Sequence, residues 1–97
     1  MARFGVYRIG TSLVLDVQAE LLDALATRVV VPLLAEDRAP KPIRDLNPVF
    51  EIEGTRCVMA TQALAAVPVK ELLRCGVSLS AHRDEITKAL DILLTGF

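Results

Sequence analysis

Side chains that could act as a nucleophile, a base and an orienting acid occur together in one short stretch of the chain. Ser80, His82 and Asp84 occupy every second position, and Ser78 precedes them. A hydrolytic triad requires the nucleophile to contact its base and a third group to orient that base. Side chains two residues apart around a helix start point in different directions. We therefore interpret Ser80 as a helix N-cap and His82 as a solvent-exposed residue.

Other patterns that could support catalysis are equally weak. Glu51 and Glu53 share one face of a predicted strand and could form an acid–base pair, but two solvated glutamates on a hairpin are far commoner. The glycines are scattered singly, so no phosphate-binding loop is present in the sequence. Acidic neighbours offset Arg38, Lys41 and Arg44, and no aromatic residue interleaves them. We expect no enzyme.

The cysteines do not form a metal-binding pattern. Cys57 and Cys75 lack CxxC spacing, and His82 is the sole histidine. A zinc site needs about four converging ligands, so we expect neither a metal nor another cofactor. A disulfide between the two cysteines is geometrically possible, but two buried thiols in a cytosolic protein are the favoured interpretation.

Length and composition limit the protein to one domain, residues 1–97. The chain has 11 Lys and Arg against 12 Asp and Glu, a formal net charge of −1. This balance argues against a basic surface for phosphate backbones. The 53% of hydrophobic residues is high for so short a chain. Monomers rarely leave large apolar patches exposed, so we expect self-association or a dedicated partner.

The N-terminal residues do not resemble a signal peptide, because charge returns at Arg8 before an apolar core can form. The longest apolar run, Val29–Ala35, contains Pro32 and falls far below the roughly 20 residues that span a bilayer. We therefore expect a soluble cytoplasmic protein that does not interact with membranes.

The first half of the chain reads as short strands joined by loops. Two strands flank a hairpin loop at Ile9–Ser12, and valine-rich Thr27–Leu33 predicts a strand buried on both faces. Pro32 lacks a backbone donor, which predicts an edge or a bulge near its end. Val17–Leu25 could be a short helix or an ordered connection, and proline-rich Glu36–Pro48 predicts a surface loop.

The second half predicts one more hairpin before a helical end. Val49–Glu53 and Arg56–Ala60 are joined by Gly54-Thr55, a pair that suits a type II′ turn. After Pro68, Val69–Arg74 predicts a short helical turn that Gly76 ends.

The C-terminal segment predicts an amphipathic helix that begins after the Ser80 N-cap. Ile92 and Leu94 lie outside its main apolar stripe, so we expect an exposed contact surface there. The stripe itself consists of Ile86, Leu90, Leu93 and Phe97, with Ala89 beside them.

Eight short segments, spread over nearly the whole chain, resemble the CcdB toxin family in order and approximate spacing. They are Phe4-x-Val6-Tyr7, Leu15-Asp16-Val17-Gln18, Val30-Val31-Pro32-Leu33, Leu46-Asn47-Pro48-Val49, Met59-x-Thr61, Ala66-Val67-Pro68-Val69, His82-Arg83-x-x-Ile86 and the terminal Gly96-x. The resemblance implies a mainly β protein: an SH3-like, partly open antiparallel barrel of the CcdB/MazF-like toxin fold with a long C-terminal helix. It also implies a homodimer.

The resemblance further implies the toxin of a type II toxin–antitoxin module. Such toxins bind the A subunit of DNA gyrase and trap the enzyme on cleaved DNA. A CcdA-like antitoxin neutralises the toxin, and the complex represses its own operon through DNA contacts of the antitoxin. Phe4 and Tyr7 match aromatic family positions, for which core packing is the favoured interpretation.

The residues that match the family's contact surface are Leu21, Leu22, Asp91, Leu94, Thr95, Gly96 and Phe97. Several differ from the family pattern. Thr95-Gly96-Phe97 stands where the best-known members have Trp-Gly-Ile, Asp91 replaces an asparagine and Leu94 replaces a phenylalanine. Because threonine has no ring to stack on an arginine, a first alternative keeps the fold and the antitoxin but not the gyrase target.

A second alternative is an endoribonuclease of the MazF type, since those toxins share the barrel. Such an enzyme requires a general base and cationic phosphate clamps beside a groove. Arg56 and Arg83 are the candidate clamps, although nothing clusters with them in the sequence.

Overall fold

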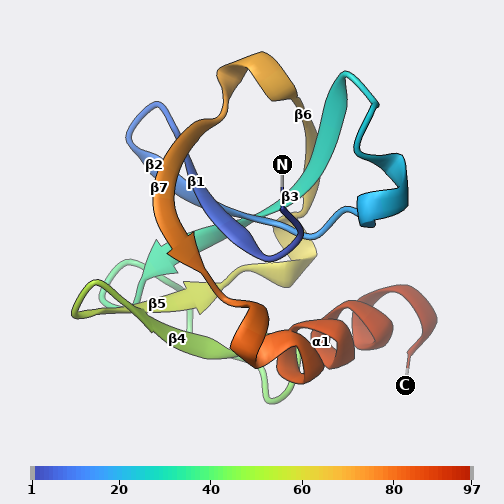
Figure 1. Cartoon of the computed structure of the whole chain (residues 1–97). Helices are drawn as coiled ribbons and strands as arrows, with labels where there is room; N and C mark the ends of the chain where they lie inside the picture. Colours follow the sequence, from blue (N-terminus) through green and yellow to red (C-terminus); the bar gives the residue numbers. More distant parts are fainter. Residues whose placement is uncertain (1, 97) are drawn as a thin grey trace.

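Seven strands form one antiparallel sheet that curls into a barrel, and a helix follows it (Figure 1). This computed structural model describes residues 2–96. The sheet order is β4-β5-β3-β2-β1-β7, with β6 paired to β3, and no ladder of the described residues joins β4 to β7. The predicted mainly β, SH3-like, partly open barrel with a C-terminal helix is therefore confirmed. The elements are β1 (Gly5–Ile9), β2 (Ser12–Asp16), β3 (Thr27–Ala35), β4 (Val49–Ile52), β5 (Thr55–Met59), β6 (Ala65–Pro68), β7 (Leu73–Ser78) and α1 (Arg83–Thr95).

Strand β3 holds the barrel together because it pairs with three other strands. One edge pairs with β2, and the other pairs first with β6 and then with β5. Pro32 lies where this second edge changes partner, and its carbonyl accepts a hydrogen bond from the N–H of Ala60. The missing proline donor therefore falls at a break between two ladders, where no strand partner is deprived of it.

The core lies between the curled sheet and α1. Ile86 and Ala89 of the helix are fully buried and join a cluster that includes Leu15, Val31 and Met59. Along β4 the predicted alternation is confirmed, because Phe50 and Ile52 are buried whereas the glutamates between and after them are exposed. Phe4 and Tyr7 are also buried, as the core-packing interpretation predicted.

The β4–β5 turn differs from the prediction by one residue. Ile52 pairs with Thr55, so the two central residues are Glu53 and Gly54, with φ angles of +50° and +82°. Two positive φ angles define a type I′ turn, whose twist matches that of the flanking strands. The predicted Gly54-Thr55 type II′ turn is therefore wrong: Gly54 is the second central residue of the turn and not the first, and it adopts the positive φ required there without a steric cost.

Replacing Glu53 with asparagine is expected to raise the free energy of unfolding by about 0.5–1 kcal/mol, since asparagine tolerates the left-handed conformation better than glutamate. Chemical denaturation measures the change. The same substitution at exposed Glu51, in the extended strand, is the control and should not stabilise the protein. An equal change in the free energy of unfolding at both positions would contradict the explanation by the left-handed conformation of residue 53.

The helical turn predicted for Val69–Arg74 is confirmed only for its first half, because strand β7 begins at Leu73. A single 3-10 turn forms at Val69–Glu71, after which the chain extends and pairs with β1. Tyr7 pairs with Arg74 whereas Val6 pairs with Val77, so β7 carries two extra residues. Gly76, with φ +72°, belongs to this bulge and does not end a helix.

The start of α1 also differs from the prediction. A 3-10 turn covers Ser80–His82, and the α-helix begins at Arg83 with His82 as its N-cap residue. The Ser80 side chain makes no capping hydrogen bond. The backbone N–H of Ser80 donates instead to Oγ of Ser78 (3.2 Å). The N-cap assignment of Ser80 is therefore wrong.

Two loops complete the chain. The segment from Val17 to Leu25 is an ordered connection with one 3-10 turn at Glu20–Leu22, which resolves the alternative left open by the sequence. The predicted loop Glu36–Pro48 is confirmed, because no helix or strand forms between β3 and β4.

Candidate partner-binding surface

An exposed apolar loop connects β2 to β3. We call residues 19–26 the leucine loop, because every residue in it is exposed and three are leucines. The exposed fractions are 94% for Leu21, 47% for Leu22 and 50% for Leu25. Leucines that the core does not bury are available to a protein partner.

Buried polar side chains hold this loop at its base. The fully buried guanidinium of Arg28 donates to Oδ2 of the fully buried Asp16 (2.5 Å) and to Oδ1 of Asp23 in the loop (2.9 Å). The side-chain amide of Gln18 donates to the carbonyls of Leu22 (3.0 Å) and Thr27 (3.2 Å). The loop is therefore fixed although its own side chains are not in the core.

The C-terminal end of α1 forms a second exposed region. Leu94 is 71% exposed, and Asp91 and Thr95 are exposed beside it. Gly96 ends the helix in the left-handed conformation, with φ +82°, and its N–H donates to the carbonyls of Asp91 and Ile92. Phe97, also predicted to belong to the surface and to the helix stripe, lies outside the described residues.

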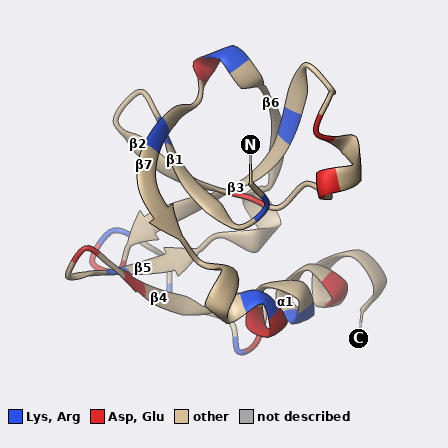
Figure 2. Ribbon diagram, in the orientation of Figure 1, with Lys and Arg blue, Asp and Glu red and all other residues tan. Residues whose placement is uncertain are grey.

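The leucine loop and the end of α1 lie toward the same side of the molecule in the view of Figure 1. Charges of both signs alternate over the ribbon, without a continuous run of one sign (Figure 2). The outer side of the helix carries acidic and basic residues, including Lys88, which contacts Asp45 (3.5 Å). Apolar side chains therefore distinguish these two regions more clearly than charge does.

The residues considered for a hydrolytic triad do not assemble into one. Nδ1 of His82 lies 3.2 Å from Oε1 of Glu85, and its ring packs against Phe50 with a centroid distance of 5.0 Å. Between residues 2 and 96 no hydrogen bond joins His82 to Ser80 or Asp84. Its partners are those of a helix-start residue at the protein surface.

The candidate phosphate clamps have other partners. Arg56 donates two hydrogen bonds to Glu36, at 3.0 and 3.2 Å, and Glu36 raises the pKa of Arg56 above its ordinary value. Arg83 lies over the Phe4 ring, 5.7 Å from its centroid. No group of three or more His, Cys, Asp or Glu that could hold a metal occurs among the described residues.

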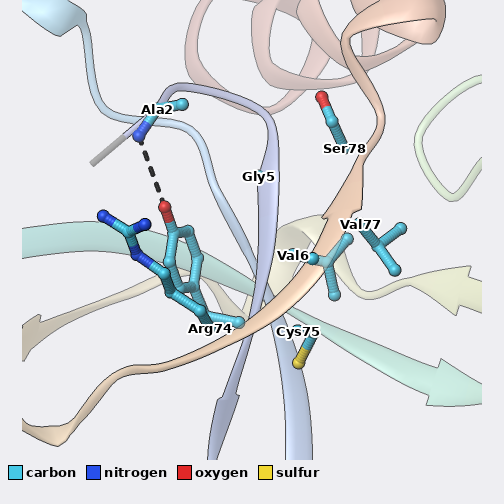
Figure 3. A pocket seen from close by; sticks show the side chains of 9 residues that line it. Ala2, Gly5, Val6, Arg74, Cys75, Val77 and Ser78 are labelled. Carbon is cyan, nitrogen blue, oxygen red and sulfur yellow. Dashed lines mark hydrogen bonds between the residues drawn. The ribbon is translucent and has the colours of Figure 1, made fainter.

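A pocket of about 330 Å³ opens over the β7 bulge (Figure 3). Across it the N–H of Ala2 donates to the hydroxyl of Tyr7 (3.3 Å). A Cβ at Gly5 would lie 3.0 Å from the Tyr7 ring and from the carbonyl oxygen of Ala2, so a larger residue there would have to displace these groups by a few tenths of an ångström. Of the predicted surface residues that the structure describes, none lines this pocket.

Both cysteines are free thiols, and their environments differ. Cys57 is 2% exposed, and burial raises the pKa of its thiol above the ordinary 9.0.

Because the thiolate is the reactive form, we expect iodoacetamide at pH 8 to alkylate partly exposed Cys75 well before Cys57. Mass spectrometry of the native protein over time measures the order. Equal rates in the folded protein would contradict it, and denaturation should equalise them.

No helix within residues 2–96 is long and apolar enough to cross a membrane.

The curled, partly open barrel, its C-terminal helix and the exposed leucines define a small SH3-like barrel protein with exposed apolar side chains. The family model described as CcdB protein matches residues 3–96, and the chain belongs to this family. Membership supports its assignment as a toxin of a toxin–antitoxin module.

Proposed function

We propose that this CcdB-family protein binds the A subunit of DNA gyrase and traps gyrase on cleaved DNA, acting by binding and not by catalysis. The observation that carries the proposal is the family match over residues 3–96, joined to the exposed leucines that the fold leaves at the matching positions. The proposed contact residues are Leu21, Leu22, Asp91, Leu94, Thr95, Gly96 and Phe97.

The same proposal includes a cytoplasmic homodimer that a CcdA-like antitoxin neutralises, with DNA contacted through the antitoxin. Exposed leucines occur on the leucine loop, on β7 and on α1, where Leu94 is 71% exposed. A chain of this size that leaves so many large apolar side chains exposed has surface to bury against a second copy and a partner.

A pull-down with the purified gyrase A subunit tests the target. Wild-type protein should retain this subunit, and cleaved DNA linked to gyrase should accumulate, whereas removal of residues 95–97 should abolish both effects. Unchanged binding after truncation would contradict the proposed contact. Incubation of the purified protein with RNA is the parallel test for the endoribonuclease alternative, and reproducible cleavage would contradict a non-enzymatic toxin.

One observation favours a second candidate function, a toxin of this family with a target other than gyrase. The Thr95 hydroxyl donates to the carbonyl of Asp91 (2.6 Å), so this side chain bonds back onto the helix. The family tryptophan at the matching position presents a ring to the target instead.

Thr95→Trp distinguishes the two candidates. If gyrase is the target, the added ring should strengthen binding to its A subunit about tenfold, the value expected for a desolvated cation–π contact. Thr95→Val, which removes the hydroxyl without adding a ring, is the control and should not strengthen binding. Growth arrest without gyrase-linked DNA breaks on overexpression would instead support the second candidate.

A further inference from the structure

We propose that Gln18 and Arg28 are positioning residues: they fix the leucine loop in the conformation that a protein partner binds, and so set the affinity for that partner. This inference rests on the proposed function, because it assigns the loop to the contact with the gyrase A subunit. Neither residue is exposed enough to form much of that contact itself, since Gln18 is 7% and Arg28 0% exposed.

Apolar packing holds the loop only in part, because Leu22 and Leu25 keep about half of their surface exposed. Residues 19–26 are all exposed, and its 3-10 turn contains no buried residue. Three backbone hydrogen bonds lie within it, donated by the N–H groups of Leu22, Asp23 and Leu25. A single short turn of this kind is marginal without support from the rest of the protein.

Gln18 connects the loop to both flanking strands. Its Nε2 donates to the carbonyl of Leu22 within the loop and to that of Thr27 at the start of β3. Its Oε1 accepts the N–H of Val29 (3.0 Å), two residues further along β3. Its own N–H donates to Asp16 at the end of β2. One buried residue thus joins the middle of the loop to the strands on either side.

Arg28 connects the loop to β2. Nε and Nη2 donate to Oδ2 of Asp16, while Nη1 donates to Oδ1 of Asp23. The planar guanidinium can serve two carboxylates in fixed directions at once, which the point charge of a lysine cannot do. Asp16 in turn accepts the N–H of Gln18 at its other oxygen (3.0 Å), so the two positioning residues form one network.

A loop held in this way presents its leucines without first having to be ordered. Ordering flexible side chains and backbone at an interface weakens binding, and preorganisation removes that cost. Loss of the network should therefore weaken binding even though the exposed leucines are unchanged.

Gln18→Glu tests the inference while keeping the hydrogen bond that the N–H of Val29 in β3 donates to this side chain. A carboxylate still accepts the N–H of Val29 but cannot donate to the carbonyls of Leu22 and Thr27. We expect amide hydrogen exchange at Leu22, Asp23 and Leu25 to become about tenfold faster or more, and binding to the gyrase A subunit to weaken about tenfold. Amides of β2 and β3 should keep their protection. Glu51→Gln, the reverse exchange on an exposed side chain of β4 that lies outside the proposed contact surface, is the control and should change neither measurement.

The possible outcomes separate a positioning role of Gln18 from a general structural role and from no role. Faster loop exchange together with weaker binding supports the positioning role. Unchanged loop exchange, or faster exchange with unchanged binding, would overturn it. General loss of protection in β2 and β3 would show a structural role for Gln18 and would also overturn it. If the wild-type protein does not bind gyrase, the proposed function fails and the positioning of the loop for this partner fails with it, although its ordering by Gln18 can still be measured by exchange.

Discussion

Replacing Arg28 with methionine is expected to lower the free energy of unfolding by about 3–5 kcal/mol, the usual cost of removing one partner from a buried ion pair. Arg28 and Asp16 have no exposed side-chain surface, so the remaining Asp16 carboxylate would keep a buried charge without its guanidinium. For a domain of this size the loss is a large part of the total stability. Urea denaturation followed by circular dichroism measures it.

The double variant Asp16→Asn with Arg28→Met is the control for this explanation. Asparagine removes the buried charge, and its carbonyl oxygen can still accept the N–H of Gln18. We expect the double variant to be more stable than Arg28→Met alone by at least about 1 kcal/mol, because residues in one network do not act additively. If the double variant lost as much stability as the two single variants together, the explanation by an unpaired buried charge would be contradicted.

Leu21→Ser is expected to weaken binding to the gyrase A subunit by about 10- to 100-fold, the factor that corresponds to the burial of a leucine at an interface. Because Leu21 is 94% exposed, the free energy of unfolding should change by less than about 0.5 kcal/mol. Titration calorimetry with the purified subunit measures the affinity, and urea denaturation checks the fold.

Leu73→Ser is the matched control for Leu21. Leu73 is also an exposed leucine, with 60% of its surface accessible, but it lies on β7 and outside the proposed contact surface. Its replacement should leave binding to gyrase unchanged. Equal losses in both variants would show that general surface hydrophobicity, and not the leucine loop, mediates the interaction.

The sequence predicted those parts of the fold in which a local hydrophobic pattern (alternation, a valine-rich run or a helical stripe) is bounded by clear turn or loop residues. The first hairpin, β3, the β4–β5 pair and the C-terminal helix were found in this way. β7 was missed because Gly76 interrupts its pattern and because its pairing with β1 depends on residues about 70 positions apart in the chain. A bulge that places two extra residues in one strand leaves no local periodicity from which it could be inferred.

The exposed state of the candidate surface could be anticipated only in part. Leu94 was expected outside the helix stripe, and its exposure confirms this. The network below the leucine loop was not found, because Asp16, Gln18 and Arg28 read as ordinary strand-end residues. A buried arginine is rare unless it is paired, so the signal that could have located it was a valine-rich predicted strand with one arginine near its start.

The pairing of β1 with β7 has a consequence for the synthesis of this protein. The first strand to leave the ribosome finds this partner only after residue 78 has been translated, and the core is complete only with Ile86 and Ala89 of α1. Contacts between distant segments form slowly. The newborn chain therefore completes its core only when the C-terminal helix has been translated, and a chain that stops before residue 86 should stay unfolded.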